Sequence, residues 1–209
     1  VESAGANLLR YRVEDCMFVG SHYARLARMS AAGIPVLTIV HGSATAGGAY
    51  MPGMSDFVVM VRDRARAFLA GPPLLKAATG EIATEEELGG ALMHASVSGL
   101  AEYLAEDDAD AIRALREHLR HLAWHRHESS LPAATEPRFA ADELLSIMPV
   151  DGRKPVDMRE IIARLCDDSD FMEFQPTYGP ATVCAHASIG GFAVGILSNN
   201  GPLDPAGSN

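Results

Sequence analysis

The 209-residue sequence contains few cysteines and few basic residues, and each shortage excludes a class of protein. Its three cysteines, at positions 16, 166 and 184, are scattered without metal-ligand spacing, which argues against a disulfide framework and indicates reduced thiols in a cytosolic protein. The 17 Lys and Arg residues face 27 Asp and Glu residues, which gives a formal net charge of −10. A general binder of nucleic acid or of an anionic membrane is therefore not expected.

Long apolar runs and the common catalytic motifs are also missing. No run reaches membrane-spanning length, and no signal-peptide pattern opens the chain. The sequence lacks a G-x-S-x-G nucleophile elbow, an H-E-x-x-H zinc motif, a P-loop and a G-x-G-x-x-G turn after a strand. The chain begins without Met and ends soon after an apolar run, so we expect it to be a piece of a larger protein.

Residues 35–50, PVLTIVHGSATAGGAY, are the most informative stretch that is present. Residues 36–40 predict one buried strand, residues 41–48 predict a turn of small side chains, and residues 49–51 can open a short helix. Such a turn presents backbone N–H groups, and the helix dipole favours negative charge there. The alternative is a tight turn that needs glycine only for packing, and these residues alone leave both interpretations open.

The remaining pattern predicts an α/β protein with parallel crossovers. Thr84 is the expected N-cap of one helix, with Glu87 completing a capping box. Residues 125–138 predict a polar linker between residues 1–124 and residues 139–209, and its His125 and His127 fit a solvated segment better than a metal site. We expect helices at 14–29, 74–78, 85–88, 108–122, 141–148 and 157–165, and strands at 36–40, 56–61, 65–70, 181–187 and 192–197.

Side chains with catalytic potential are scarce. Asp107 and Asp108 precede a helix, where acidic residues compensate the dipole, so we interpret them as helix-start residues rather than a catalytic pair. We interpret His94 as a buried, hydrogen-bonded histidine rather than a base. What remains is backbone chemistry: the N–H groups of Gly47 and Gly48 can hold a developing oxyanion such as the enolate of a thioester.

Six motifs, spaced in order along nearly the whole chain, resemble those of one family. They resemble the carboxyltransferase (β) subunit of biotin-dependent acyl-CoA carboxylases, of the methylcrotonyl-, geranyl- and propionyl-CoA carboxylase type. The run through residues 80–81 is most similar to the methylcrotonyl- and geranyl-CoA branch. The motifs are SAGANL at 3–8, TAGGAY at 45–50, LAGPPLLKAATGE at 69–81, LGGALMH at 88–94, DMREIIARL at 157–165 and GILSNNG at 195–201.

The resemblance implies a crotonase-like (ClpP/crotonase) β-β-α superhelix, of which this chain is an incomplete first half. Residues 1–124 would be the acyl-CoA-binding core, and residues 139–209 would be helices plus a terminal β-hairpin that joins the same or the following domain. The half that the family uses for biotin is not expected in this chain.

The implied reaction transfers a carboxyl group from carboxybiotin to the α or γ carbon of an acyl-CoA, through an enolate held in a backbone oxyanion hole. The proton is thought to go to biotin itself, so the resemblance implies no dedicated protein base and no metal. By the same resemblance, Gly47 and Gly48 are the catalytic residues. The CoA-binding residues that it implies are Ser3, Ala4, Gly5, Ala6, Ala46, Tyr50, Gly71, Pro72 and Lys76.

The resemblance further implies a biotin carboxylase and biotin carboxyl carrier partner, and a homo-oligomer that is a dimer or a trimer of dimers. The expected compartment is the bacterial cytoplasm, or the mitochondrial matrix in a eukaryote, and the piece alone is expected to be inactive. Ala4 stands where glycine is more usual, and residues 13–19 have less polar, aromatic character than in the methylcrotonyl branch, which leaves the acyl group open. Two alternatives remain: a crotonase-type hydratase, isomerase or decarboxylase, and a non-catalytic scaffold subunit.

Overall fold

The structure, a computed structural model, describes residues 1–4, 10, 12–122, 133–202, 205 and 207–208. The chain divides into two compact units, residues 1–115 and residues 116–209. Residues 125–132 of the expected linker at 125–138, with His125 and His127, lie outside the described residues. The expected domain boundaries stay a prediction.

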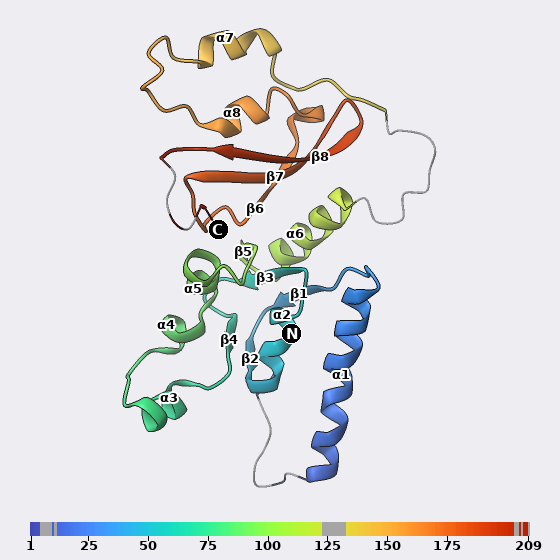
Figure 1. Cartoon of the computed structure of the whole chain (residues 1–209), viewed down its shortest axis with the longest axis vertical. Helices are drawn as coiled ribbons and strands as arrows, with labels where there is room; N and C mark the ends of the chain where they lie inside the picture. The colour runs from blue at the N-terminus through green and yellow to red at the C-terminus, as the bar shows by residue number, and fades with distance from the viewer. Residues whose placement is uncertain (5–9, 11, 123–132, 203–204, 206, 209) are drawn as a thin grey trace. The chain divides into compact units, whose positions relative to one another are not determined.

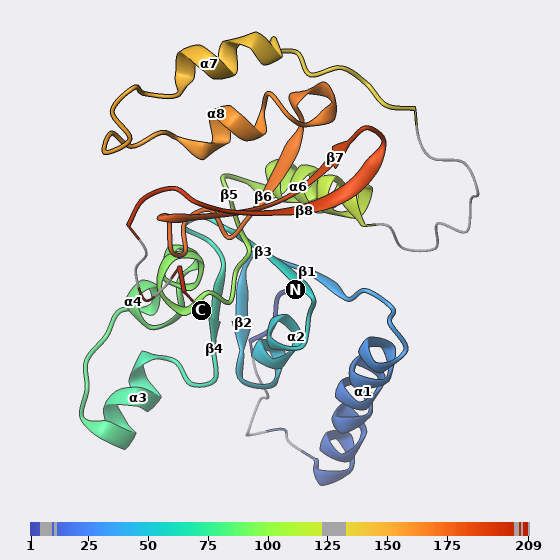
Figure 2. The same cartoon turned by 45° about the horizontal axis from the view of Figure 1, so that its top comes forward.

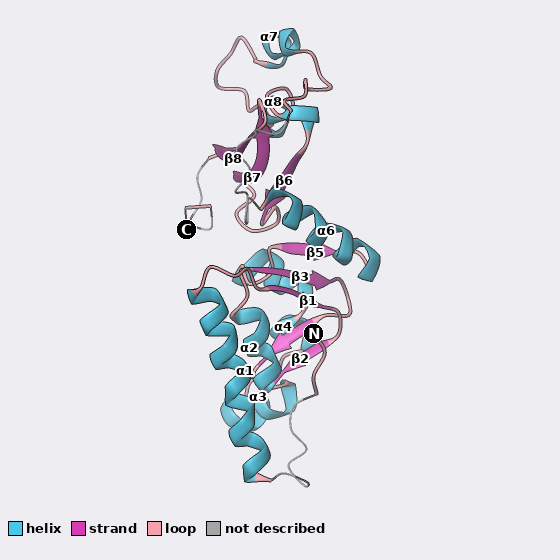
Figure 3. Ribbon diagram, turned by 90° about the vertical axis from the view of Figure 1, so that its right-hand side faces the viewer, coloured by secondary structure: helices cyan, strands magenta, loops and turns pink. Residues whose placement is uncertain are grey.

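The first unit is built on parallel strands. Strands β1 (Leu37–Val40), β3 (Phe57–Val61) and β5 (Tyr103–Ala105) form one sheet in the order β1-β3-β5, and β2 (Ser43–Thr45) pairs in parallel with β4 (Arg66–Phe68) (Figure 1, Figure 3). Parallel neighbours need crossover connections. The α/β class predicted from the sequence is therefore confirmed.

The centre of this unit is β3. All five of its residues are buried, each with no more than 1% of its surface exposed. A strand between two others that is covered on both faces reads as a continuous apolar run, which is the FVVMV of the sequence. The edge strand β1 instead alternates between buried and half-buried residues.

Helices flank the two small strands β2 and β4. Figures 1 and 2 show α1 (Val13–Ala31) on the side of α2 (Tyr50–Gly53), and α3 (Pro72–Thr79) and α4 (Glu85–Gly89) beyond β4. The capping box of α4 is confirmed: the Glu87 N–H donates to Thr84 Oγ1 at 3.2 Å, and the Thr84 N–H donates to Glu87 Oε2 at 2.8 Å. A short α5 (Ala91–Met93) and a π-helical turn η2 (His94–Ser98) follow.

The prediction of an unbroken turn over residues 41–48 is wrong in part. Ser43–Thr45 form β2, because residues distant in the sequence pair with them: β4 on one side and Ser3, in a parallel bridge to Ala44, on the other. Ala44 is fully buried between them. The turn then continues as the 3₁₀ helix η1 (Ala46–Ala49), so the order β1-β2-η1 replaces a single strand-to-helix turn.

The second unit contains an antiparallel sheet in the order β6 (Phe171–Phe174), β7 (Thr182–Ile189) and β8 (Phe192–Asn199). The predicted hairpin is confirmed, and its turn residues Gly190 and Gly191 have φ of +61° and +82°, as a two-residue type I′ turn requires. Strand β6 was not predicted. It pairs along β7 with Phe171 opposite Ala187.

Short helical segments complete the second unit. They are η3 (Ala141–Glu143), α7 (Leu144–Ile147), α8 (Met158–Ile162) and η4 (Asp167–Ser169). Ile162, Cys166, Val183 and Ala187 form the core between α8 and β7, consistent with the position of α8 in Figure 2. Helix α6 (Asp108–His121) crosses the boundary between the units. In the part of the chain that is described, no helix is long and apolar enough to span a membrane.

Candidate functional site

The structure brings two small-residue segments together. The Ser3 N–H donates to the Ser43 carbonyl at 2.6 Å, and the Thr45 N–H donates to the Ser3 carbonyl at 3.2 Å. The Ser3 hydroxyl also donates to the Thr45 carbonyl at 3.3 Å. Ser3 therefore lies against the Gly47–Gly48 loop from forty residues away. Ala4 is exposed, and Gly5 and Ala6 lie outside the described residues.

Neither glycine of the loop has room for a side chain. A Cβ on Gly48 would lie 1.8 Å from Ser3 Oγ and 2.8 Å from Ser3 Cβ. A Cβ on Gly47 would lie 2.6 Å from Tyr23 Oη. Packing alone therefore requires glycine at both positions. The same bare backbone also allows a bound molecule to approach the main chain.

The backbone at the start of η1 has an unusual conformation. Ala46 has a φ of +54°, in the left-handed region that alanine rarely adopts, and η1 then continues as a right-handed 3₁₀ helix. A left-handed residue next to right-handed ones turns successive N–H groups toward one point, which makes an anion-binding nest. In a 3₁₀ helix that begins at Ala46, the N–H groups of Ala46 and Gly47 come before the first i→i+3 bond, which engages Gly48.

Tyr23 of α1 holds this loop from outside. Its hydroxyl donates to the Gly47 carbonyl at 2.6 Å, and the Tyr50 N–H donates to the same oxygen. The rings of Tyr23 and Tyr50 are 5.6 Å apart between centroids. Sequence reasoning missed Tyr23, because helical spacing alone does not show which residue of α1 meets a loop 24 positions later.

An apolar pocket of about 410 Å³ begins at Ala49, beside the two glycines. His94 is its one titratable lining residue, and it is 8% exposed. His94 Nε2 lies 2.7 Å from the Ala67 carbonyl oxygen and Nδ1 lies 2.8 Å from Ser98 Oγ. A carbonyl only accepts, so Nε2 carries the hydrogen. Both ring nitrogens are engaged, which confirms a buried, hydrogen-bonded histidine. The lining residues are Ala49, Ala67, Phe68, Leu69, Ala70, Leu88, His94 and Leu100.

The other residues expected to contact CoA lie at α3. Gly71 is its N-cap residue, with its carbonyl accepting the N–H groups of Leu74 and Leu75 at 3.0 and 3.1 Å, and Pro72 is its first residue. Lys76 is exposed in its last turn. Their contact with CoA stays a prediction.

The acidic pair at the start of α6 has the structural role that the sequence indicated. Asp107 Oδ1 accepts the Asp110 N–H at 2.8 Å, which satisfies an N–H of the first turn. Asp108 Oδ2 accepts from Arg64 Nη1 at 2.9 Å. The two carboxylates therefore have local partners, which confirms them as helix-start residues.

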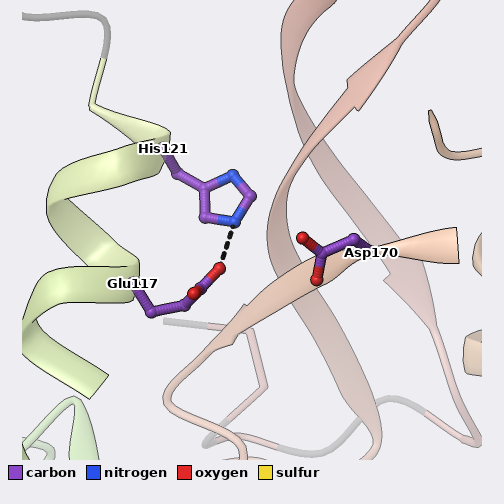
Figure 4. A group of neighbouring side chains, drawn as sticks. All are labelled: Glu117, His121 and Asp170. Carbon is purple, nitrogen blue, oxygen red and sulfur yellow. Dashed lines mark hydrogen bonds and ion pairs between the residues drawn. The ribbon is translucent and has the colours of Figure 1, made fainter. Parts of the chain in front are cut away.

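Glu117, His121 and Asp170, in the second unit, have metal-ligating atoms within 4.8 Å of one another (Figure 4). His121 Nε2 lies 3.0 Å from Glu117 Oε1. Arg120 Nη2, however, donates to Glu117 and, at 2.7 Å, to Asp170. A metal ion would have to displace a guanidinium that already compensates both carboxylates. We therefore assign the group to an ion-pair network.

Comparison with known proteins gives two similar relatives. The chain is 50% identical over 199 residues to the probable biotin-dependent acyl-coenzyme A carboxylase beta2 subunit of Mycobacterium tuberculosis, covering 95% of this chain and 37% of that protein. It is 45% identical over 208 residues to the mitochondrial methylcrotonoyl-CoA carboxylase beta chain of Dictyostelium discoideum, covering 97% and 35%. The chain thus spans little more than a third of these relatives.

Two solved structures are also similar. The beta subunit of P. aeruginosa geranyl-CoA carboxylase matches at 50% identity and a TM-score of 0.55, over 100% of this chain and 39% of that one. The hexameric transcarboxylase 12S, with methylmalonyl-coenzyme A and methylmalonic acid bound, matches at 32% identity and a TM-score of 0.83, over 96% and 39%. The family described as the carboxyl transferase domain matches residues 1–209. With an α/β fold and two small-residue loops in contact, the chain belongs to the carboxyl transferase domain family.

Proposed function

We propose that the protein containing this chain is the carboxyltransferase (β) subunit of a biotin-dependent acyl-CoA carboxylase, and that this chain supplies the acyl-CoA side of its site. The single observation that carries the proposal is the nest at Ala46–Ala49, with Ser3 packed against it. The order β1-β2-η1 also agrees with a crotonase-like β-β-α unit, which we propose as the fold.

The chain's part in catalysis is electrostatic. We assign the N–H groups of Gly47 and Gly48 to the thioester carbonyl oxygen of the acyl-CoA. The Gly48 N–H, which the first i→i+3 bond of η1 engages, would share its hydrogen between that bond and the bound oxygen, as three-centre bonds at helix ends do. When the substrate carbon loses its proton, negative charge grows on that oxygen, and donors that are already fixed stabilise it without reorganising. Loss of one such donor typically lowers kcat by roughly 10²–10³. Neither Gly47 nor Gly48 has room for a side chain.

The remaining proposed contacts are with CoA. Ser3, Ala4 and Ala46 would line the thioester end, and Tyr50, which is 53% exposed, would lie beside it. From the sequence pattern, Gly5 and Ala6 belong to the same group. Gly71, Pro72 and Lys76 of the α3 region would line the CoA groove further out. The exposed ammonium of Lys76 has the charge to pair with a phosphate group.

The biotin group of a partner supplies the carboxyl group when it is bound. We assign no residue of this chain to biotin, because the family resemblance implies that this contact lies in a half outside the chain. The proposed partners are a biotin carboxylase and a biotin carboxyl carrier protein or domain. The proposed assembly is a homo-oligomer, by analogy with the hexameric transcarboxylase. The proposed compartment is the bacterial cytoplasm or, in a eukaryote, the mitochondrial matrix, by analogy with the two relatives.

The test is carboxyl exchange by the full-length protein between malonyl-type CoA esters and free biotin, followed with ¹⁴C-labelled carboxyl groups. Transfer of label to biotin with at least one ester supports the proposal. Calorimetric binding of CoA esters without exchange contradicts it, and hydration or isomerisation of an enoyl-CoA without biotin would indicate a crotonase-type enzyme. The absence of both CoA-ester binding and carboxyl exchange would indicate a scaffold subunit.

A further inference from the structure

We propose that Tyr23 is a positioning residue for the oxyanion donors, which it orients through the carbonyl of Gly47. This inference rests on the proposed function. It adds a residue of α1 to a site otherwise made of loops, and it assigns a role to a side chain outside the family-like motifs found in the sequence.

The geometry of one peptide unit carries the inference. Tyr23 Oη donates to the Gly47 carbonyl at 2.6 Å. The peptide between Gly47 and Gly48 is planar, with its C=O and N–H on opposite edges. Fixing the carbonyl oxygen on one edge therefore fixes the direction of the Gly48 N–H on the other. Because the Tyr50 N–H donates to the same oxygen, two donors define the plane.

The hydrogen bond also changes the peptide electronically. A donor on the carbonyl draws charge toward the oxygen, and hydrogen bonds in chains strengthen one another. The Gly48 N–H thereby becomes a better donor, both in the i→i+3 bond that stiffens the first turn of η1 and toward an oxygen that shares its hydrogen.

The surroundings of Tyr23 indicate that this polar contact is specific. Many residues of α1 are exposed, with Val13 64% and Met29 37% exposed, whereas Tyr23 is half-buried. Its hydroxyl occupies the space that a side chain on Gly47 would fill, at 2.6 Å from the Cβ position. The Tyr23 hydroxyl can therefore reach the Gly47 backbone only because Gly47 has no side chain.

The experiment compares Tyr23→Phe with Tyr103→Phe in the full-length protein. The control also removes a bonded hydroxyl, which lies 2.8 Å from Arg113 Nη2 and 3.4 Å from Asp110 Oδ2, away from the loop. Carboxyl exchange gives kcat and KM for the acyl-CoA. Infrared difference spectra of a bound thioester labelled with ¹³C at its carbonyl report how strongly the donors polarise that carbonyl.

We expect Tyr23→Phe to lower kcat about tenfold with little change in KM, because about 1.4 kcal/mol of transition-state stabilisation corresponds to a factor of ten. The downshift of the thioester carbonyl band should shrink, and Tyr103→Phe should leave kcat and band unchanged. If kcat falls while the band stays in place, or if both variants behave alike, the positioning role is overturned. If the wild-type protein neither exchanges carboxyl groups nor binds CoA esters, the proposed function itself fails, and this inference fails with it.

Discussion

At the scale of single residues, the site depends on the lack of side chains at two glycines. Gly48 leaves space that the Ser3 side chain fills, and Gly47 leaves space for the Tyr23 hydroxyl. The glycine pair was recognisable in the sequence because adjacent glycines mark turns and loops. Their partners were not recognisable, since nothing local to Ser3 or Tyr23 indicates a contact with residues 47 and 48.

The first prediction follows from the contact between Ser3 and Gly48. Gly48→Ala should destabilise the full-length protein by about 1–3 kcal/mol, the usual range for overpacking, because the new methyl group overlaps Ser3 Oγ at 1.8 Å. Ser3→Gly removes both atoms that clash, so the double variant should recover most of the lost stability. Thermal unfolding of the wild type, both single variants and the double variant measures this coupling. If the double variant loses as much stability as Gly48→Ala alone, the contact between Ser3 and Gly48 is contradicted.

At the scale of elements, local rules located most of the helices and the hairpin. The capping box of α4 and the Gly190–Gly191 turn are encoded within a few residues, so they were predictable. Strands β2, β5 and β6 were not, because three or four residues carry too little periodicity and each strand depends on pairing with a distant strand. Helix α8 ends at Ile162, short of the predicted position 165, and residues 163–165 form a turn before the buried Cys166.

Helix α6 meets β7 through two histidines. His118 is 6% exposed and its ring lies edge-on to that of His186, with the centroids 5.9 Å apart. Burial, followed by the nearby His186 and His121, lowers the pKa of His118 from 6.5 to about 4. Burial and His121 also lower the pKa of His186. Both rings are therefore neutral in the folded protein at pH 7.

The second prediction is the pH dependence that follows. Between pH 6.5 and 4 the unfolded chain binds a proton at His118 that the folded chain does not, so the free energy of unfolding falls as the pH falls. The contribution of the neutral His118 ring to the free energy of unfolding is fully present above pH 6.5. It is at most about 3 kcal/mol, at 1.36 kcal/mol per pKa unit. Denaturant unfolding of full-length wild type and His118→Phe at pH 7 and pH 5 measures it.

His118→Phe should lose less stability than the wild type on going from pH 7 to pH 5. His22→Phe, at an exposed position of α1, is the matched control and should follow the wild type. Glu117 and Asp170, which lie beside His121, are present in all three proteins and so do not distinguish them. Identical pH profiles for His118→Phe and the wild type would show that the ring is not held neutral.

At the scale of the whole molecule, the chain covers little more than a third of the length of the similar proteins. It spans 37% of the M. tuberculosis relative and 39% of the geranyl-CoA carboxylase beta subunit. The ordered motifs were recognisable in the sequence because family motifs are local strings. Which acyl group is bound was not recognisable, because a pocket such as the one at Ala49 combines residues 49, 67–70, 88, 94 and 100.

The third prediction concerns activity of the separate chain. Residues 1–209 produced alone should give no carboxyl exchange above background, whereas the full-length protein should give exchange with at least one acyl-CoA. The reason is that we place the biotin contact outside this chain, so the donor of the carboxyl group has no site. Exchange assays at equal protein concentration, with circular dichroism to show that the short chain is folded, provide the measurement. Exchange by the folded short chain would contradict the division of the site.

The sequence by itself determined the family, the parallel α/β class, the capped helix, the hairpin and the glycine loop, because each depends on residues that lie close together in the chain. Only the tertiary structure decided that Ser3 and Tyr23 meet Gly48 and Gly47, that β2 interrupts the loop, and that both nitrogens of His94 are engaged. Apart from the bond between His94 and Ser98, these contacts join residues 20 to 45 positions apart. Such contacts are set by the packing of whole elements, on which a short stretch of sequence carries no information.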